Sequence, residues 1–230
     1  MPVSALFFDV FGTLVDWRGS IAREARRRFG VRFDGEGFAD AWRAEYQPAM
    51  ERVRSGGRGY VKLDVLHAEN LDRVLPRFGL EGVGADERAE LNRVWHRLDA
   101  WPEVPEALER LRGRFLLAPM SNGHIALMVA LARHNGFHWD AILGAEIARD
   151  YKPKPGVYQA GSAAFDLAPE CCMMVAAHSD DLVAAEAAGL RTAHIARPDE
   201  FGPGMGEAGP LAPVNFSARD LAHLAEQFGL

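Results

Sequence analysis

Short apolar runs alternate with helical patterns over most of the chain. Each run has the length of a buried strand, and apolar residues in the stretch that follows it recur about every three to four positions. This alternation is typical of an α/β protein with a parallel sheet and right-handed crossovers. The predicted strands are residues 5–10, 115–120, 173–177 and 192–196, with a shorter one at 141–143, and the predicted helices are residues 104–112, 125–134, 156–165 and 181–188.

The alternation is interrupted between the first and second predicted strands. Residues 16–101 show no convincing strand pattern, and their apolar and aromatic residues recur at helical spacing. We therefore expect a Rossmann-like core domain of residues 1–15 and 102–230, with a helical domain of residues 16–101 inserted after the first strand. The Gly- and Pro-rich residues 197–213 predict an irregular surface segment.

Composition narrows the range of partners and locations. The formal net charge of −6 gives no reason to expect nucleic acid or an anionic membrane surface as a partner. Cys171 and Cys172 offer no disulfide framework, so we expect two buried strand residues in a reducing cytoplasm. The sequence shows no signal peptide, and no apolar run reaches the roughly 18 residues of a membrane-spanning helix. The apolar helix faces around Trp42 and Tyr46 look too large for one small domain to bury, which favours a homodimer.

Polar side chains follow the ends of the predicted strands, where open α/β sheets bind their ligands. Asp9 ends the first apolar run and is followed by a Gly-Thr turn at Thr13; such a carboxylate can be a nucleophile or can simply cap a turn. Ser121 and Asn122 follow the second run, where the backbone N–H groups that open a helix can bind an anion. Lys152 lies on a loop made rigid by prolines, although an ordinary surface lysine is the alternative.

His178 and Asp181 follow a third strand. These strand ends and loops, in this order, resemble the four motifs of the haloacid dehalogenase superfamily, and the resemblance covers nearly the whole chain, with the helical insert as a cap. Two positions depart from the superfamily's phosphatases. Phe11 stands where they usually have a second Asp, and His178 stands where they have an acid that binds Mg²⁺, an ion that prefers hard oxygen ligands.

The pattern is similar to that of the L-2-haloacid dehalogenase (type II) branch, which uses neither a metal nor another cofactor. Phe11 stands in place of that branch's Tyr, Arg43 matches its cap arginine, and Tyr158 matches the tyrosine that follows its lysine loop. The fourth motif departs, because His178 and the two residues before it replace Ser-Ser-Asn, and Asp180 replaces Trp. Some family members with defluorinase activity are similar in having His here, so fluoroacetate-type substrates are included.

The resemblance implies hydrolysis of small 2-haloalkanoic acids to 2-hydroxy acids, through an ester on Asp9 and with inversion at C2. The substrate carboxylate would lie in the cradle of Ser121 and Asn122, near Lys152. Halide would leave toward Arg43, and water would then attack the carbonyl of the ester. His178 either serves as a general base or only orients hydrogen bonds. The expected catalytic residues are Asp9, Thr13, Lys152, His178 and Asp181, and the expected substrate- or halide-binding residues are Phe11, Arg43, Ser121, Asn122 and Tyr158.

Two other functions remain as alternatives. A Mg²⁺-dependent phosphatase acting on a small phosphate ester would share the fold, but Phe11 and His178 both oppose it. A binding or regulatory protein that has lost activity on this scaffold would have no physical need for Asp9, Thr13 and Lys152 all at strand ends or loops. Substituting Asp9→Asn separates these classes, because only an enzyme must lose its turnover.

Overall fold

A six-stranded, fully parallel sheet forms the centre of the protein, in a computed structural model that describes residues 2–230. The strands are β1 (Ala5–Phe8), β2 (Leu116–Ser121), β3 (Leu143–Gly144), β4 (Cys172–Ala176), β5 (Arg191–Ile195) and β6 (Phe216–Ala218), in the order β3-β2-β1-β4-β5-β6. Phe8, the last residue of β1, pairs in register with Pro119 of β2 and Val175 of β4. The carboxyl ends of these three strands therefore meet at one edge of the sheet.

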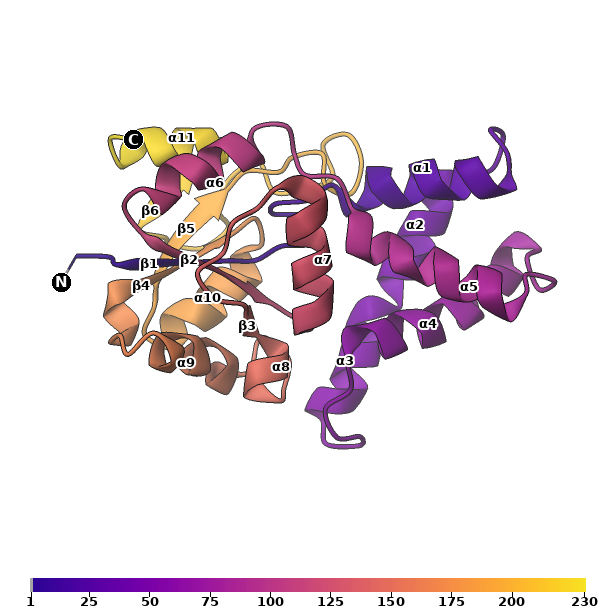
Figure 1. The fold of residues 1–230 in the computed structure, drawn as a ribbon, viewed down its shortest axis with the longest axis horizontal. Coiled ribbons are helices and arrows are strands. Elements are labelled where there is room, and N and C mark those ends of the chain that lie inside the picture. Colours follow the sequence, from indigo (N-terminus) through magenta and orange to yellow (C-terminus); the bar gives the residue numbers. More distant parts are fainter. Residues whose placement is uncertain (1) are drawn as a thin grey trace.

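Helices cover both faces of the sheet (Figure 1). They are α6 (Val104–Arg112), α7 (Ile125–Asn135), α8 (Ala145–Ala148), α9 (Pro155–Ala164), α10 (Ser179–Ala187) and α11 (Leu221–Gln227). Leu6 and Phe8 face a core shared with α6, α7 and α11, whereas Ala5 and Phe7 face a core shared with α9 and α10. Burial on both faces explains why the strands read as unbroken apolar runs.

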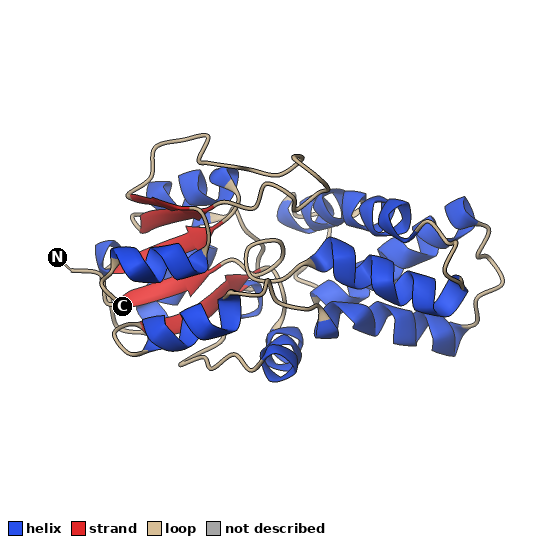
Figure 2. Cartoon of the chain, turned by 90° about the horizontal axis from the view of Figure 1, so that it is seen from above, coloured by secondary structure: helices blue, strands red, loops and turns tan. Residues whose placement is uncertain are grey.

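The remaining helices lie beyond the carboxyl ends of the strands, which point toward them in Figure 2. We call residues 17–97, which contain these helices, the helical segment. Its elements are α1 (Trp17–Phe29), α2 (Gly35–Ala44), α3 (Tyr46–Arg54), α4 (Leu63–Val74), the 3₁₀ turn η1 (Leu75–Phe78), α5 (Ala85–Asn92) and the 3₁₀ turn η2 (Arg93–Arg97).

Two stretches of chain connect the helical segment with the sheet, and they lie side by side. The backbone N–H of Asp16 donates to the carbonyl of Asp99 (2.9 Å), and that of Trp101 donates to the carbonyl of Leu14 (3.0 Å). The first helix begins at this crossing because the Asp16 carboxylate accepts a hydrogen bond from the backbone N–H of Gly19 (2.8 Å), as an N-cap residue does. The crossing is therefore a short hydrogen-bonded ribbon.

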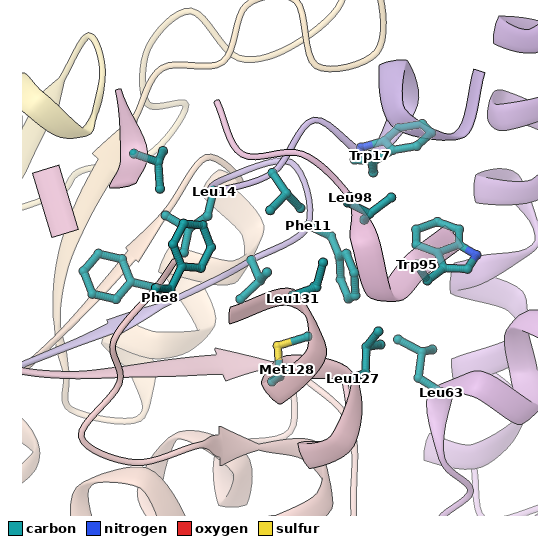
Figure 3. Close-up of a cluster of buried hydrophobic side chains, with 14 of the residues drawn as sticks. Phe8, Phe11, Leu14, Trp17, Leu63, Trp95, Leu98, Leu127, Met128 and Leu131 are labelled. Atoms are coloured by element: carbon teal, nitrogen blue, oxygen red, sulfur yellow. The ribbon is translucent and has the colours of Figure 1, made fainter. Parts of the chain in front are cut away.

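An apolar cluster joins the helical segment to the rest of the protein. Phe11, just after β1, packs edge-on against Trp95, with ring centroids 5.7 Å apart and planes at 89°. Figure 3 shows Leu98 on one side of this pair, and Leu63 and Leu127 of α7 next to each other on the other side. These side chains are buried in one cluster, so the contact between the two parts of the chain is continuous and apolar.

The sheet and its main helices confirm the predicted α/β fold, with corrections at its edges. The short third strand lies at Leu143–Gly144 instead of residues 141–143, and the edge elements β6 and α11 have no predicted counterpart. Cys171 belongs to the 3₁₀ turn η3 (Pro169–Cys171) and is only partly buried, so Cys172 alone is the strand residue that we expected. Within residues 2–230, no helix combines the length and apolar character needed to cross a bilayer.

The apolar faces of the helical segment are covered by the chain itself. Trp42 is 1% exposed and Tyr46 is 5% exposed, and the other large apolar residues of this face are equally buried. The indole N–H of Trp42 also donates to the carbonyl of His67 (2.9 Å). These faces are therefore largely covered within one chain and give no support for a homodimer, which stays a prediction.

Candidate active site

Asp9 lies directly after β1, with three donors around its carboxylate. The Thr13 hydroxyl donates to Oδ2 (2.8 Å), Lys152 Nζ donates to Oδ1 (2.9 Å), and His178 Nδ1 lies 3.3 Å from Oδ2. Burial alone would raise the pKa of Asp9, but the charges and hydrogen bonds of Lys152 and His178 outweigh it and hold this pKa well below its usual range. Asp9 is therefore an ionised carboxylate, as a nucleophile must be.

Lys152 connects Asp9 with a second carboxylate. Its Nζ lies 2.5 Å from Asp181 Oδ2, and the Tyr158 hydroxyl donates to Asp181 Oδ1 (2.5 Å). Burial alone would lower the pKa of Lys152, but Asp181 and Asp9 raise it above its usual value, so the ammonium stays charged. The backbone N–H of Lys152 also donates to the side-chain carbonyl of Asn122 (2.8 Å), which ties the lysine loop to the loop after β2.

The turn after Asp9 has a conformation that only glycine takes easily. Gly12 has φ of +87°, and a Cβ placed there would lie 2.0 Å from Glu200 Oε1. The turn brings the Thr13 hydroxyl to the backbone N–H of Ala177, which donates to it (2.9 Å), so Thr13 bonds to the ends of β1 and β4 at once. Thr13 thereby fixes the position of the Asp9 carboxylate.

His178 lies between two carboxylates. One is Asp9, and the other is Glu200, whose Oε2 is 2.8 Å from His178 Nε2 and whose Oε1 accepts from the indole N–H of Trp17 (3.0 Å). Burial alone would lower the pKa of His178, but hydrogen bonds and charges from Asp9 and Glu200 raise it well above its usual value. In this state the imidazole is protonated and acts as a donor to both acids.

Glu200 was not among the predicted site residues. It lies in the irregular segment of residues 197–213, which is irregular as expected, but Glu200 and Arg197 of this segment are buried instead of lying at the surface. Arg197 donates to the Thr13 carbonyl (2.9 Å) and pairs with Glu103 (2.6 Å), which holds the segment against the site. A glycine-rich stretch carries no periodic pattern, so no signal in it distinguishes Glu200 from a surface acid.

A cavity of about 700 Å³ opens in front of Asp9, between the sheet and the helical segment. Side chains from the helical segment form its far wall, among them Trp17, Arg43 and Tyr46. The Arg43 guanidinium lies over the Tyr46 ring (4.0 Å) and near the Trp17 ring (5.4 Å), and its Nη1 is buried without a hydrogen-bond partner. A buried cationic donor without a partner, facing a cavity, is suited to bind an anion.

The predicted site residues occupy two layers. Asp9, Phe11, Arg43, Asn122, Lys152, His178 and Asp181 line the cavity, as do Asp180 and Tyr46. Thr13, Ser121 and Tyr158 are buried behind this lining, where the Ser121 hydroxyl accepts from the backbone N–H of Gly123 (3.0 Å). These three residues hydrogen-bond to Asp9, Asp181 and the loop after β2, and their direct contact with a ligand stays a prediction.

The donor set around Asp9 is unsuited to Mg²⁺. An ammonium contacts both Asp9 and Asp181, and the neighbouring position holds an imidazole instead of an acid. Mg²⁺ prefers oxygen ligands in octahedral geometry, and here cations already fill the places next to both carboxylates. The arrangement instead matches a carboxylate nucleophile that attacks a substrate bearing its own leaving group.

A family model of haloacid dehalogenase-like hydrolases matches residues 3–189. The chain belongs to this family. A crystal structure of the defluorinating L-2-haloacid dehalogenase Rha0230 shares 41% sequence identity with this haloacid dehalogenase-like hydrolase, with a TM-score of 0.92 over 99% of this chain and 96% of that one. The crystal structure of the L-2-haloacid dehalogenase PA0810 shares 40% identity, with a TM-score of 0.93 over 98% of this chain and 99% of that one.

Sequence relatives of this haloacid dehalogenase-like hydrolase carry related names. (S)-2-haloacid dehalogenase 1 of Pseudomonas sp. (strain CBS-3) is 29% identical over 210 residues, which cover 87% of this chain and 88% of the relative. Haloacetate dehalogenase H-2 of Moraxella sp. (strain B) is 28% identical over 201 residues, covering 85% and 86%. The similarity therefore extends over the sheet and the helical segment alike.

Proposed function

We propose that this protein hydrolyses small 2-haloalkanoic acids to 2-hydroxy acids through an ester on Asp9, with inversion at C2. One observation carries the proposal: an ionised, buried Asp9 faces a cavity in which Arg43 offers an unpartnered cationic donor. The names of the relatives, which include a haloacetate and several (S)-2-haloacid dehalogenases, support the same reaction class. The defluorinating relative supports fluoroacetate-type substrates as well.

The missing acid near Asp9 favours a leaving group that needs no proton. The oxygen of an alcohol or of a phosphate ester is a poor leaving group unless an acid protonates it as it departs. The position two residues after Asp9 is Phe11, whose ring packs on Trp95 and offers no proton. Halide leaves without one, so an apolar residue is compatible with carbon–halogen cleavage and opposes the phosphatase alternative.

In the first step the substrate carboxylate lies against Asn122 and the backbone N–H groups of the loop that follows β2. Asp9 attacks C2 from the side opposite the halogen, the carbon–halogen bond breaks, and halide leaves toward Arg43. Lys152 keeps Asp9 ionised until the attack, because its charge lowers the pKa of the carboxyl. Attack from the opposite side inverts the configuration at C2.

In the second step water attacks the carbonyl carbon of the Asp9 ester, so C2 is not touched again. Esterification removes the charge of Asp9, and His178 then faces one carboxylate, Glu200, instead of two. The pKa of His178 falls as a result, so the imidazolium first releases its Nδ1 proton to solvent. The freed Nδ1 then accepts the proton of the attacking water while Glu200 holds Nε2. The 2-hydroxy acid leaves with that proton, and the Asp9 carboxylate is restored.

The helical segment serves as a cap in this scheme. We assign residues 16–101 to a cap domain and residues 1–15 and 102–230 to the core domain, because the cavity lies between them. Excluding water from the cavity strengthens the attraction between its charges and the substrate. The same proposal places the enzyme in a reducing cytoplasm, where proteins that lack disulfides are common.

Halide release tests this function directly. Chloroacetate, fluoroacetate and each enantiomer of 2-chloropropionate are incubated with the protein in excess EDTA. We expect halide from chloroacetate and from one enantiomer only, unaffected by EDTA, and none from the Asp9→Asn variant. In a single turnover in ¹⁸O-water, the label should enter the carboxylate of Asp9 and not the 2-hydroxy acid. No halide from any substrate would overturn the proposal and direct the search to phosphate esters with Mg²⁺.

A further inference from the structure

Three potential metal ligands converge at the junction between the helical segment and the sheet. Asp64 lies in the first turn of α4, His96 in the 3₁₀ turn η2, and His124 directly before α7. Each offers one ligand atom, and these atoms all lie within 4.8 Å of one another. Among the described residues that line the cavity in front of Asp9, none belongs to this cluster, so the cluster is separate from the proposed active site.

The spacing of the ligand atoms fits a tetrahedral metal ion. His96 Nε2 lies 2.9 Å from Asp64 Oδ2, and His124 Nε2 lies 3.4 Å from the same oxygen. Zn²⁺ bonds of about 2.0–2.1 Å at tetrahedral angles place ligand atoms about 3.3 Å apart. The two imidazole rings are inclined at 69°, with centroids 6.0 Å apart, so they do not stack on each other. Both Nε2 atoms lie within 3.4 Å of Asp64 Oδ2.

The surroundings of the cluster suit an ion that retains one water molecule. His124 is 3% exposed, and among the described residues its Nδ1 has no hydrogen-bond partner. Its other ring nitrogen, Nε2, contacts Asp64. The Asp64 side chain is 34% exposed and that of His96 is 23% exposed, which leaves an open side for a fourth ligand and an entry path. Two imidazoles and a carboxylate with one open position form a typical zinc ligand set.

A second ionic contact positions the same segments independently of the cluster. Glu146 accepts from the backbone N–H of Ile125, the residue after His124 (2.7 Å), and pairs with Lys62, two residues before Asp64 (3.2 Å). The starts of α4 and α7 are therefore held together even without an ion. The cluster is preorganised, which lowers the cost of gathering its ligands.

We propose that Asp64, His96 and His124 bind one divalent transition-metal ion of the Zn²⁺ class. Imidazole nitrogen favours such an ion over Mg²⁺ or Ca²⁺, which prefer oxygen ligands. The ion joins α4 and η2 of the helical segment to the loop that follows β2, two residues after Asn122. It takes no part in carbon–halogen chemistry, and its effect is to stabilise the contact between the two parts of the chain.

Metal binding by the full chain tests this proposal without any reference to activity. Protein stripped with a chelator and dialysed is titrated with Zn²⁺ by calorimetry, and with Co²⁺ by visible absorption, which reports tetrahedral nitrogen and oxygen ligation. We expect one Zn²⁺ per chain and a higher unfolding temperature in its presence. Asp64→Asn and His96→Ala should weaken binding by more than about tenfold, since even residues outside the metal-bound shell contribute on the order of 10–100-fold.

Two further variants control the experiment. His134 forms a comparable His–Asp pair with Asp99 (2.9 Å) but has no second histidine, so His134→Ala should bind Zn²⁺ as the parent protein does. Asp9→Asn should also retain binding, which separates this site from the carboxylates of the proposed active site. The proposal is wrong if no stoichiometric Zn²⁺ binds, or if Asp64→Asn and His96→Ala bind as tightly as His134→Ala. Folding of each variant is checked by circular dichroism.

Discussion

Replacing Glu200 by Gln tests whether the second half of the reaction depends on the His178–Glu200 contact. Glu200 is 2% exposed, with His178 Nε2 at 2.8 Å and the Trp17 indole N–H at 3.0 Å. Gln keeps the size and one acceptor but removes the charge. A hydrogen bond to a charged group contributes about 1.5–3 kcal/mol, which corresponds to about 10–100-fold in rate. We expect ester hydrolysis to slow by about this factor, because His178 becomes a weaker base.

Formation of the ester should slow much less, so the variant should release one equivalent of halide in a rapid burst and then turn over slowly. Rapid quenching with halide detection measures the burst, and intact-protein mass spectrometry detects the ester on Asp9. Glu207→Gln is the matched control, since Glu207 of the same irregular segment pairs with His194 (3.3 Å), outside the cavity lining. Equal slowing of both steps in Glu200→Gln, with no ester accumulating, would refute the assignment of His178 as the base.

Three further predictions concern other parts of the protein. Phe11→Ala should destabilise the fold by about 3–5 kcal/mol in chemical denaturation because Phe11 is 2% exposed, whereas a result near that of Phe201→Ala, 40% exposed, would contradict its place in the core. Arg43→Lys keeps the charge but loses the flat contact with Tyr46, so single-turnover halide release should slow by about tenfold; an unchanged rate would exclude Arg43 from the site. Hydrogen bonds from Arg27 and Arg28 lower the pKa of Glu24 from 4.5 to about 2, so this acid contributes stability above pH 4.5 that is lost as the pH falls toward 2. In thermal unfolding across this pH range, the free energy of unfolding of Glu24→Gln should therefore change with pH by about 1 kcal/mol less than that of the parent protein. The same pH dependence in both proteins would refute this.

Strand ends were the part of the site that sequence patterns could predict. Asp9 and Lys152 stand beside apolar runs and prolines, which are local signals, and the parallel topology then brings them within 2.9 Å. Arg43 could be identified only by resemblance, because nothing in its helix distinguishes it from the surface arginines around it. Its cavity position depends on how the helical segment packs, which is a tertiary property.

The residues that sequence reasoning missed depend on long-range contacts. Glu200 meets Trp17 across 183 positions in the chain, and both lie outside any motif. The edge strand β6 has three residues, too few for a period-two pattern to emerge. The expectation of a homodimer rested on apolar helix faces, and such a pattern cannot tell whether another chain or this one covers them.

The ribbon at the crossing makes the helical segment an exchangeable module. Because Leu14 pairs with Trp101 and Asp16 pairs with Asp99, the two cut points for removing the segment lie next to each other in space. A segment from a relative with another substrate range could be spliced in there without lengthening either connection. The grafted segment must supply a residue that takes the place of Trp95 against Phe11, because Trp95 belongs to the helical segment and is removed with it. Substrate range in this architecture can thus change by recombination at two neighbouring points, leaving Asp9 and the loops around it in place.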